Sequence, residues 1–183
     1  MRTFKETART CVNEVQVVLE SVSEEELEGV ANAFINAKRI FISGDGRSGL
    51  MGKAIAMRLM HAGYNVFVTG ETITPSIEAE DLLVLISGSA FGNGAHGFVS
   101  KAKDAKAQVA LVTANPETPL AKFCDALLVL PAATKNRKSH EPKTIQPLGN
   151  QFDQSVHVLL DALIVKLTET NQETMRARHA NLE

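Results

Sequence analysis

One stretch of the chain decides the fold: Arg39-Ile-Phe-Ile-Ser43-Gly44-Asp-Gly46-Arg-Ser-Gly49. A short apolar run ends in a glycine-rich turn, and a longer segment follows the turn. Glycine suits a backbone that turns sharply and approaches a ligand, and the exposed amides at the start of a helix favour an anion. The stretch therefore predicts a strand, an anion-binding turn and a helix, in that order.

Four more apolar runs repeat this plan along the chain. We expect the five strands at Arg39–Ser43, Asn65–Thr69, Leu82–Ser87, Gln108–Thr113 and Ala126–Leu130. Segments long enough for helices separate them, which is typical of a parallel sheet, and the runs are apolar throughout, as expected of strands covered on both faces. The sequence therefore predicts an α/β fold, a three-layer α/β/α sandwich with a five-stranded parallel sheet. Any helix between the second and third strands is expected to be short or broken.

Helical periodicity flanks the strands. Apolar residues recur at three- and four-residue spacing from Phe4 to Val22, and Ser23 and Glu26 form a capping box that starts a second helix. Residues 131–149 are a long irregular stretch rich in Lys and Arg, and long loops are often functional. A final amphipathic helix begins near Phe152, and a polar tail follows it. The first helix and the tail both favour a homo-oligomer.

Composition limits the class of protein. With 183 residues, 44% of them hydrophobic, the chain closes one sizeable core, so we expect a single domain over residues 1–183. The formal charge of −2 provides no global attraction to nucleic acid or to an anionic membrane. Cys11 and Cys124 lack metal-ligand spacing, which fits a reducing compartment and argues against structural zinc. No apolar run is long enough to span a bilayer, and the sequence predicts a cytoplasmic protein.

A second loop rich in serine and glycine follows the third strand. Its sequence is Ser87-Gly-Ser89-Ala-Phe-Gly-Asn93, and it also precedes a helix. Ligands of open parallel sheets sit at the carboxyl ends of the strands, so we expect the hydroxyls of Ser48, Ser87 and Ser89 to converge on one phosphate. Two alternatives stay open. The serines and glycines only form turns and helix caps, or the first loop binds a dinucleotide whose ribose contacts Glu71.

Short stretches along nearly the whole chain carry a resemblance to a known family. Those shared with SIS domains at large are the first glycine-rich turn and Ile86-Ser-Gly-Ser89. Much more specific are Met57-Arg-Leu-Met-His61, Gln146-Pro-Leu-Gly149 and the His-Ala-Asn-Leu-Glu part of Arg178-His-Ala-Asn-Leu-Glu183. Gly70-Glu-Thr72 and Phe152-Asp-Gln154 also belong to the resemblance. In these stretches, their order and their spacing, the chain resembles the 6-phospho-3-hexuloisomerases, a family of SIS-domain sugar-phosphate isomerases.

The resemblance implies a fold, a reaction and a partner. The fold is a five-stranded SIS domain of flavodoxin-like type, in a homotetramer of paired dimers, with no metal or organic cofactor. The reaction interconverts 3-hexulose 6-phosphate and fructose 6-phosphate. A base takes a proton from one carbon and returns it to the neighbouring carbon through an enediol, while donors stabilise the developing oxyanion. The implied partner is therefore a small sugar phosphate.

The resemblance also implies roles for individual residues. Asp153 stands where the family has its catalytic glutamate and is the implied base. His61 is implied as a proton-transfer or hydroxyl-orienting group, His179 as a group that reaches a neighbouring subunit's site, and Arg47 as a charge for phosphate or enediolate. Each residue also has an ordinary structural explanation. Asp153 and His61 suit the charges at helix ends. His179 belongs to a tail, and tails are often disordered, whereas a surface arginine such as Arg47 is commonly solvated. The implied phosphate-binding residues are Ser48, Ser87, Ser89 and Asn93.

The second loop departs from the family pattern Ser-Gly-Ser-Gly-Glu-Thr. Here Ala90, Phe91 and Gly92 follow Ser89, so a glycine, a carboxylate and a hydroxyl are lost together. Ala90 stands where a positive φ is expected, Phe91 adds an apolar surface at the pocket edge, and Asn93 replaces a phosphate donor. Three functions stay open: a hexulose-phosphate isomerase, an SIS isomerase for a different sugar phosphate, and a non-catalytic sugar-phosphate sensor. A stand-alone transcription regulator is disfavoured, because the chain has no basic recognition stripe.

Overall fold

A five-stranded parallel sheet forms the centre of the protein, in a computed structural model that describes residues 2–91, 93–168 and 172–182. The strands are β1 (Ile40–Gly44), β2 (Val66–Val68), β3 (Leu82–Ile86), β4 (Gln108–Thr113) and β5 (Ala126–Val129). They lie in the order β2-β1-β3-β4-β5, and every neighbouring pair is parallel. The predicted α/β sandwich is confirmed, and no strand extends more than one residue beyond its predicted range.

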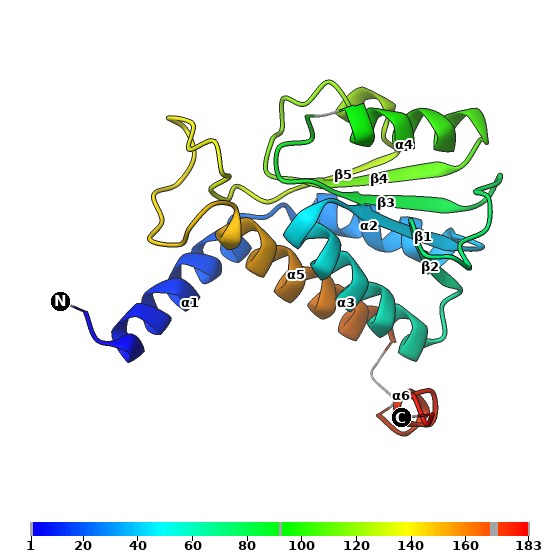
Figure 1. Ribbon diagram of the computed structural model, residues 1–183, viewed down its shortest axis with the longest axis horizontal. Helices are drawn as coiled ribbons and strands as arrows, with labels where there is room; N and C mark the ends of the chain where they lie inside the picture. The colour runs from blue at the N-terminus through cyan, green and yellow to red at the C-terminus, as the bar shows by residue number, and fades with distance from the viewer. Residues whose placement is uncertain (1, 92, 169–171, 183) are drawn as a thin grey trace.

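Helices cover both faces of the sheet (Figure 1). One face carries α2 (Glu24–Asn36), α3 (Gly46–Ala62) and α5 (Asn150–Thr168), with α1 (Phe4–Glu20) packed on α5; the other carries α4 (Asn93–Asp104). A 3-10 helix, η1 (Ala121–Phe123), precedes β5, and α6 (Gln172–Ala177) packs against α3. The connection between β2 and β3, described throughout, contains no helix, which agrees with the expectation that any helix there would be short or broken. None of the helices in the described ranges has the length and apolar character needed to cross a membrane.

Alternate residues of each strand enter two separate hydrophobic clusters. In β3 the cluster toward α4 receives Leu83 and Leu85, and the cluster toward α3 and α5 receives Leu82, Val84 and Ile86. Because both faces are buried, every position of this strand is apolar. Phe152, from the first turn of α5, is buried in the cluster toward α3 and α5. Burial of such a side chain stabilises a fold by about 1.5–3 kcal/mol. This contact fixes the start of α5 against the sheet.

The turn from β1 into α3 has a conformation that requires glycine. Gly46 adopts a φ of 56°, in the left-handed region that side chains disfavour. A Cβ atom on Gly49 would lie 2.4 Å from the carbonyl oxygen of Gly44, which is far inside van der Waals contact. The first turn of α3 therefore packs directly on the end of β1, and it holds Arg47 and Ser48 at the carboxyl edge of the sheet.

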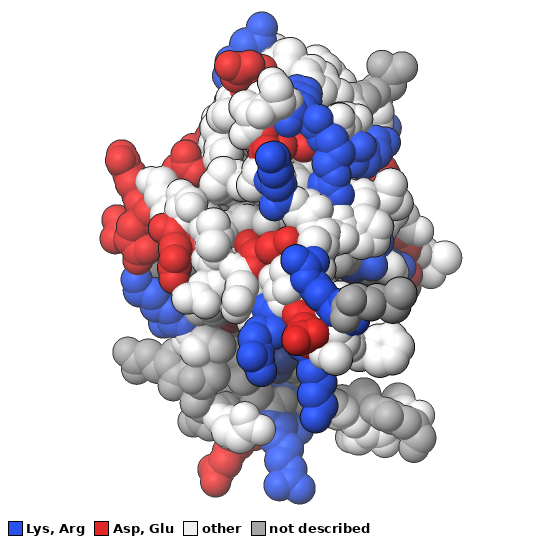
Figure 2. All heavy atoms as spheres, turned by 90° about the vertical axis from the view of Figure 1, so that its left-hand side faces the viewer, with Lys and Arg blue, Asp and Glu red and all other residues white. Residues whose placement is uncertain are grey.

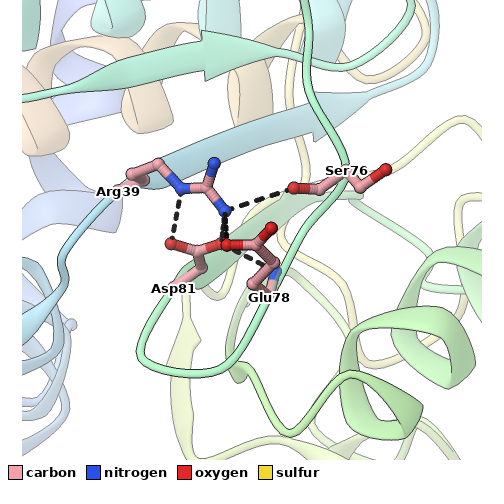
Figure 3. Close-up of polar contacts among 4 residues, drawn as sticks. All are labelled: Arg39, Ser76, Glu78 and Asp81. Carbon is pink, nitrogen blue, oxygen red and sulfur yellow. Dashed lines mark hydrogen bonds and ion pairs between the residues drawn. The ribbon is translucent and has the colours of Figure 1, made fainter.

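A cluster of ion pairs joins the starts of β1 and β3, at the amino ends of the strands (Figure 3). The Arg39 guanidinium donates from Nε to Oδ1 of Asp81 at 2.9 Å and from Nη2 to Oδ2 at 2.5 Å. Nη2 also donates to Glu78 Oε2 at 3.1 Å and to the carbonyl oxygen of Ser76 at 3.2 Å. Since Asp81 is fully buried, Arg39 neutralises a charge that would otherwise stand unpaired in the interior.

Candidate functional site

A cavity of about 320 Å³ opens at the carboxyl ends of β1 and β3. The β1–α3 turn, the β3–α4 loop, residues 131–149 and the start of α5 form its walls. Its polar and charged lining consists of Asp45, Arg47, Ser48, Ser87, Ser89, Thr134, Lys135 and Asp153. Figure 2 shows this end of the molecule, where basic and acidic side chains both appear, so the surface around the cavity is not of a single charge.

Asp153 is the buried acid of the cavity. It lies on the first turn of α5 and is 5% exposed. Ser48 Oγ donates to its Oδ1 at 2.8 Å, and Arg47 Nε lies 3.5 Å from its Oδ2. Burial raises the pKa of Asp153 above the ordinary value, although the bond from Ser48 and the charge of Arg47 act in the opposite direction. A raised pKa makes this carboxylate a stronger base.

In the described part of the β3–α4 loop, residues 87–91, hydrogen bonds tie the backbone on both sides of Ala90. The backbone N–H of Ala90 donates to Ser87 Oγ at 3.1 Å, and Thr118 Oγ1 donates to the Ala90 carbonyl oxygen at 3.0 Å. Ala90 has a φ of 48°, which confirms the expectation of a positive φ at this position. Because Ser87 Oγ accepts a bond within the loop, its own proton stays available to a ligand in the cavity.

Residues 131–149 bring two groups to the cavity that sequence reasoning did not assign to the site, Thr134 and Lys135. Thr134 donates through its N–H and its hydroxyl to the Glu141 carboxylate, at 2.9 and 2.6 Å. Lys138 Nζ lies 5.4 Å from the centre of the Phe91 ring, so this segment meets the β3–α4 loop at the edge of the cavity. The sequence signal that could have assigned Thr134 and Lys135 to the site is the position of this basic segment, directly after the carboxyl end of the last strand.

His61 and His179 lie together, away from the cavity. Their rings stack with centroids 5.4 Å apart, and Arg178 Nη1 donates to the His61 carbonyl oxygen at 3.0 Å. Burial, together with the charges of His179 and Arg58, lowers the pKa of His61. Ser48 and His61 stand at opposite ends of α3, about 20 Å apart along the helix axis. Within one chain, neither histidine lines the cavity that holds Asp153.

The cavity thus gathers most of the predicted site residues, namely Arg47, Ser48, Ser87, Ser89 and Asp153. Gly92 and the side chain of Asn93 lie outside the part of the chain that is described. Over the described ranges, no three His, Cys, Asp or Glu side chains are grouped in a way that would hold a metal ion.

Comparison with known proteins gives concordant matches. Residues 33–143 match the SIS domain family. A 3-hexulose-6-phosphate isomerase of Bacillus subtilis is 39% identical over 175 residues, which cover 94% of this chain and 95% of the relative. One of Mycobacterium gastri is 40% identical over 175 residues, which cover 93% and 87%. A crystal structure from Methanococcus jannaschii, from which a function as 3-hexulose-6-phosphate isomerase was inferred, matches with a TM-score of 0.83 and 29% identity over 96% of this chain and 98% of that one.

The regions that match known proteins contain the segments that form the cavity. The β1–α3 turn and the β3–α4 loop, which form two walls of the cavity, both fall within the matched SIS domain, and the relatives extend the match through α5 and Asp153. The chain therefore belongs to the SIS-domain family of sugar-phosphate isomerases that includes the 3-hexulose-6-phosphate isomerases.

Proposed function

We propose that this protein interconverts 3-hexulose 6-phosphate and fructose 6-phosphate through an enediol. The observation that carries the proposal is the buried carboxyl group of Asp153, held by Arg47 and Ser48 in the cavity that the serine loops also line. Two relatives at 39–40% identity bear the name of this activity. Cys11 and Cys124 are free thiols, which suits the reducing cytoplasm as the place of the reaction.

The phosphate group of the substrate is an anchor in this proposal. Ser87 and Ser89 offer hydroxyls at the end of β3, and α4 begins at Asn93 with amides that favour an anion. Ser48 donates its proton to Asp153, so we give Ser48 the task of orienting that carboxylate and leave the phosphate to Ser87, Ser89 and Asn93. Anchoring the phosphate fixes the reacting carbons within reach of the base.

Asp153 acts as the base. It takes a proton from C2 or C3, and the electron pair of the broken C–H bond forms the enediol double bond while the carbonyl oxygen gains a proton. The proton then returns to the neighbouring carbon while the hydroxyl on the first carbon loses its proton and becomes the new carbonyl, so the substrate neither gains nor loses hydrogen overall. Arg47 and Lys135 line the cavity and offset the negative charge that develops on oxygen.

The same proposal includes a homo-oligomer, a tetramer by resemblance, in which His61 and His179 act in the site of a neighbouring copy. A groove of about 460 Å³ between α1, α3 and α5 is lined mainly by apolar side chains, and Arg47 lines both this groove and the cavity. Leu50 and Met57 of α3 expose 59% and 52% of their surface. A two-fold related copy packed antiparallel along α3 would bring its own His61 and His179 toward Asp153.

The test is an assay of turnover. Purified protein receives enzymatically generated 3-hexulose 6-phosphate, and the fructose 6-phosphate formed is followed through a coupled dehydrogenase. Wild type is expected to turn over, and Asp153→Asn, which keeps the shape of the side chain, is expected to lose about 10²–10⁴-fold in kcat. Full turnover by Asp153→Asn would identify another group as the base. Phosphate-dependent binding without turnover by wild type would favour a different sugar phosphate or a sensor.

A further inference from the structure

Residues 131–149 form one wall of the cavity and contain neither helix nor strand. In Figure 1 this segment is the yellow loop that leaves the sheet and returns at the start of α5. Its backbone lacks the regular hydrogen-bond ladder of the surrounding elements, so other groups must fix its position.

Glu14, on α1, binds this segment through both of its carboxylate oxygens. Oε2 accepts from Thr144 Oγ1 at 2.5 Å and from Gln146 Nε2 at 3.1 Å, and Oε1 accepts from the N–H of Ile145 at 2.9 Å. One side chain of α1 thus holds three successive residues that are 130 to 132 positions away in the sequence.

A second connection runs through Gln151, in the first turn of α5. Gln151 Nε2 donates to the carbonyl oxygen of Glu14 at 3.1 Å, and its Oε1 accepts from the N–H of Ala133 at 2.9 Å. Ala133 directly precedes Thr134, which lines the cavity, and Gln151 stands two residues before Asp153. Glu14 is therefore tied to the segment near both of its ends and to the helix that carries the base.

The surroundings of the Glu14 carboxyl group favour its ionised form. Burial acts to raise the pKa of Glu14, but the bonds from Thr144, Ile145 and Gln146, with the charge of Arg2, outweigh it and hold the pKa below the ordinary value. Hydrogen bonds to an ionised acceptor are roughly twice as strong as those between neutral groups. A glutamine at this position would keep the shape but lose the charge and one of the two acceptor oxygens.

We propose that Glu14 is a positioning residue, which holds residues 131–149 against α1 so that Thr134 and Lys135 form the wall of the substrate cavity. Glu14 does not itself line the cavity. Its effect on the substrate runs through Thr144, Gln146 and Gln151. The inference rests on the proposed use of the cavity as the sugar-phosphate site.

The first experiment compares Glu14→Gln with Glu20→Gln, a matched control on the same helix whose carboxylate is exposed and bonded only to Gln16 among the described contacts. Loss of a charged hydrogen bond at Glu14 is expected to raise KM for 3-hexulose 6-phosphate about tenfold, with a smaller change in kcat. Glu20→Gln is expected to behave as wild type. A fall in kcat with KM unchanged in Glu14→Gln would contradict a role in shaping the binding wall.

The second experiment measures the segment directly by trypsin cleavage. The segment carries four tryptic sites, Lys135, Arg137, Lys138 and Lys143. Cleavage there is expected to be several-fold faster in Glu14→Gln than in wild type or Glu20→Gln, at equal thermal midpoints, and fructose 6-phosphate is expected to slow it. Wild-type cleavage and wild-type KM in a folded Glu14→Gln protein would overturn the inference.

Two further comparisons keep the inference open to refutation. If Glu14→Gln does not fold, Thr144→Val removes one of the same bonds from the side of the segment, and wild-type KM and cleavage in that variant would overturn the positioning role. Because cleavage requires no turnover, faster cleavage of Glu14→Gln in a protein inactive on 3-hexulose 6-phosphate would reject the proposed reaction and support the positioning. An active wild-type enzyme whose Glu14→Gln variant shows unaltered cleavage and unaltered KM would support the proposed reaction and reject the positioning role.

Discussion

Burial raises the pKa of the proposed base, Asp153, and the hydrogen bond from the Ser48 hydroxyl acts to lower it. Asp153 must be ionised to accept a proton, so kcat/KM is expected to fall as pH drops through its pKa. This fall is the acid limb of the pH profile. Since burial raises the pKa of Asp153, the midpoint of the acid limb is expected above the ordinary aspartate value of 3.8. Ser48→Ala removes a bond that lowers the pKa, and the limb is therefore expected to move to still higher pH.

The measurement is the pH profile of kcat/KM, which reports ionisations of the free enzyme. Ser89→Ala is the control, because Ser89 lines the same cavity and makes no described hydrogen bond to Asp153. Its acid limb is expected to coincide with that of wild type. An acid limb that stays in place in Ser48→Ala would mean that Asp153 is not the group observed.

Lys135 supplies a positive charge to the cavity from the wall formed by residues 131–149, whereas Arg47, on the β1–α3 turn, is already paired with Asp153. Lys135→Met keeps most of the side-chain length and removes the charge, so KM is expected to rise about tenfold, equivalent to about 1.4 kcal/mol of binding. Lys143→Met is the control, since Lys143 is exposed on the same segment and does not line this cavity. Equal KM values for the two variants would remove Lys135 from substrate binding.

At the scale of elements, the buried pair between β1 and β3 makes the clearest prediction for stability. Arg39→Met leaves the fully buried Asp81 without its guanidinium partner, and the free energy of unfolding is expected to fall by about 2–3 kcal/mol. The loss is expected to be smaller than for a wholly buried pair, because Arg39 is partly exposed. Lys103→Met breaks the half-exposed pair with Asp125 and is expected to cost less than about 1 kcal/mol. Urea denaturation of both variants gives the comparison, and equal losses would contradict it.

The sequence predicts the elements better than the contacts between them. Five apolar runs locate the strands because parallel strands are buried on both faces, and Gly44 and Gly49 mark the tight turn after β1. The pairing of Glu14 with Thr144 depends on how α1 lies across a segment 130 residues away, which no local pattern encodes. The stacking of His179 on His61 likewise arises only when α6 packs against α3.

At the scale of the whole molecule, the separation of His61 and His179 from Asp153 predicts that subunits share their sites. Asp153→Asn and His179→Ala are each expected to be nearly inactive alone. After mixing and subunit exchange, mixed two-fold pairs contain one intact site, so about a quarter of wild-type activity is expected to return. The coupled assay measures the recovery.

The control for this mixing experiment is Asp153→Asn mixed with Asp153→Ser, which share the same defect and are expected to stay inactive together. Light scattering checks that the proteins associate. Subunits that exchange without recovery of activity, or a protein that is monomeric in solution, would show that His179 does not act in a neighbouring site.

The ring of Phe91 at the edge of the cavity has an optical consequence. The chain has no Trp and a single Tyr, Tyr64, which follows the far end of α3. Phe91 is 56% exposed, and Phe91→Trp would place the protein's sole indole at this position, beside Lys138 at the cavity mouth. Excited at wavelengths where tyrosine does not absorb, its fluorescence would respond to the polarity of that mouth alone, so arrival and departure of a sugar phosphate become visible in a stopped-flow trace without any added dye.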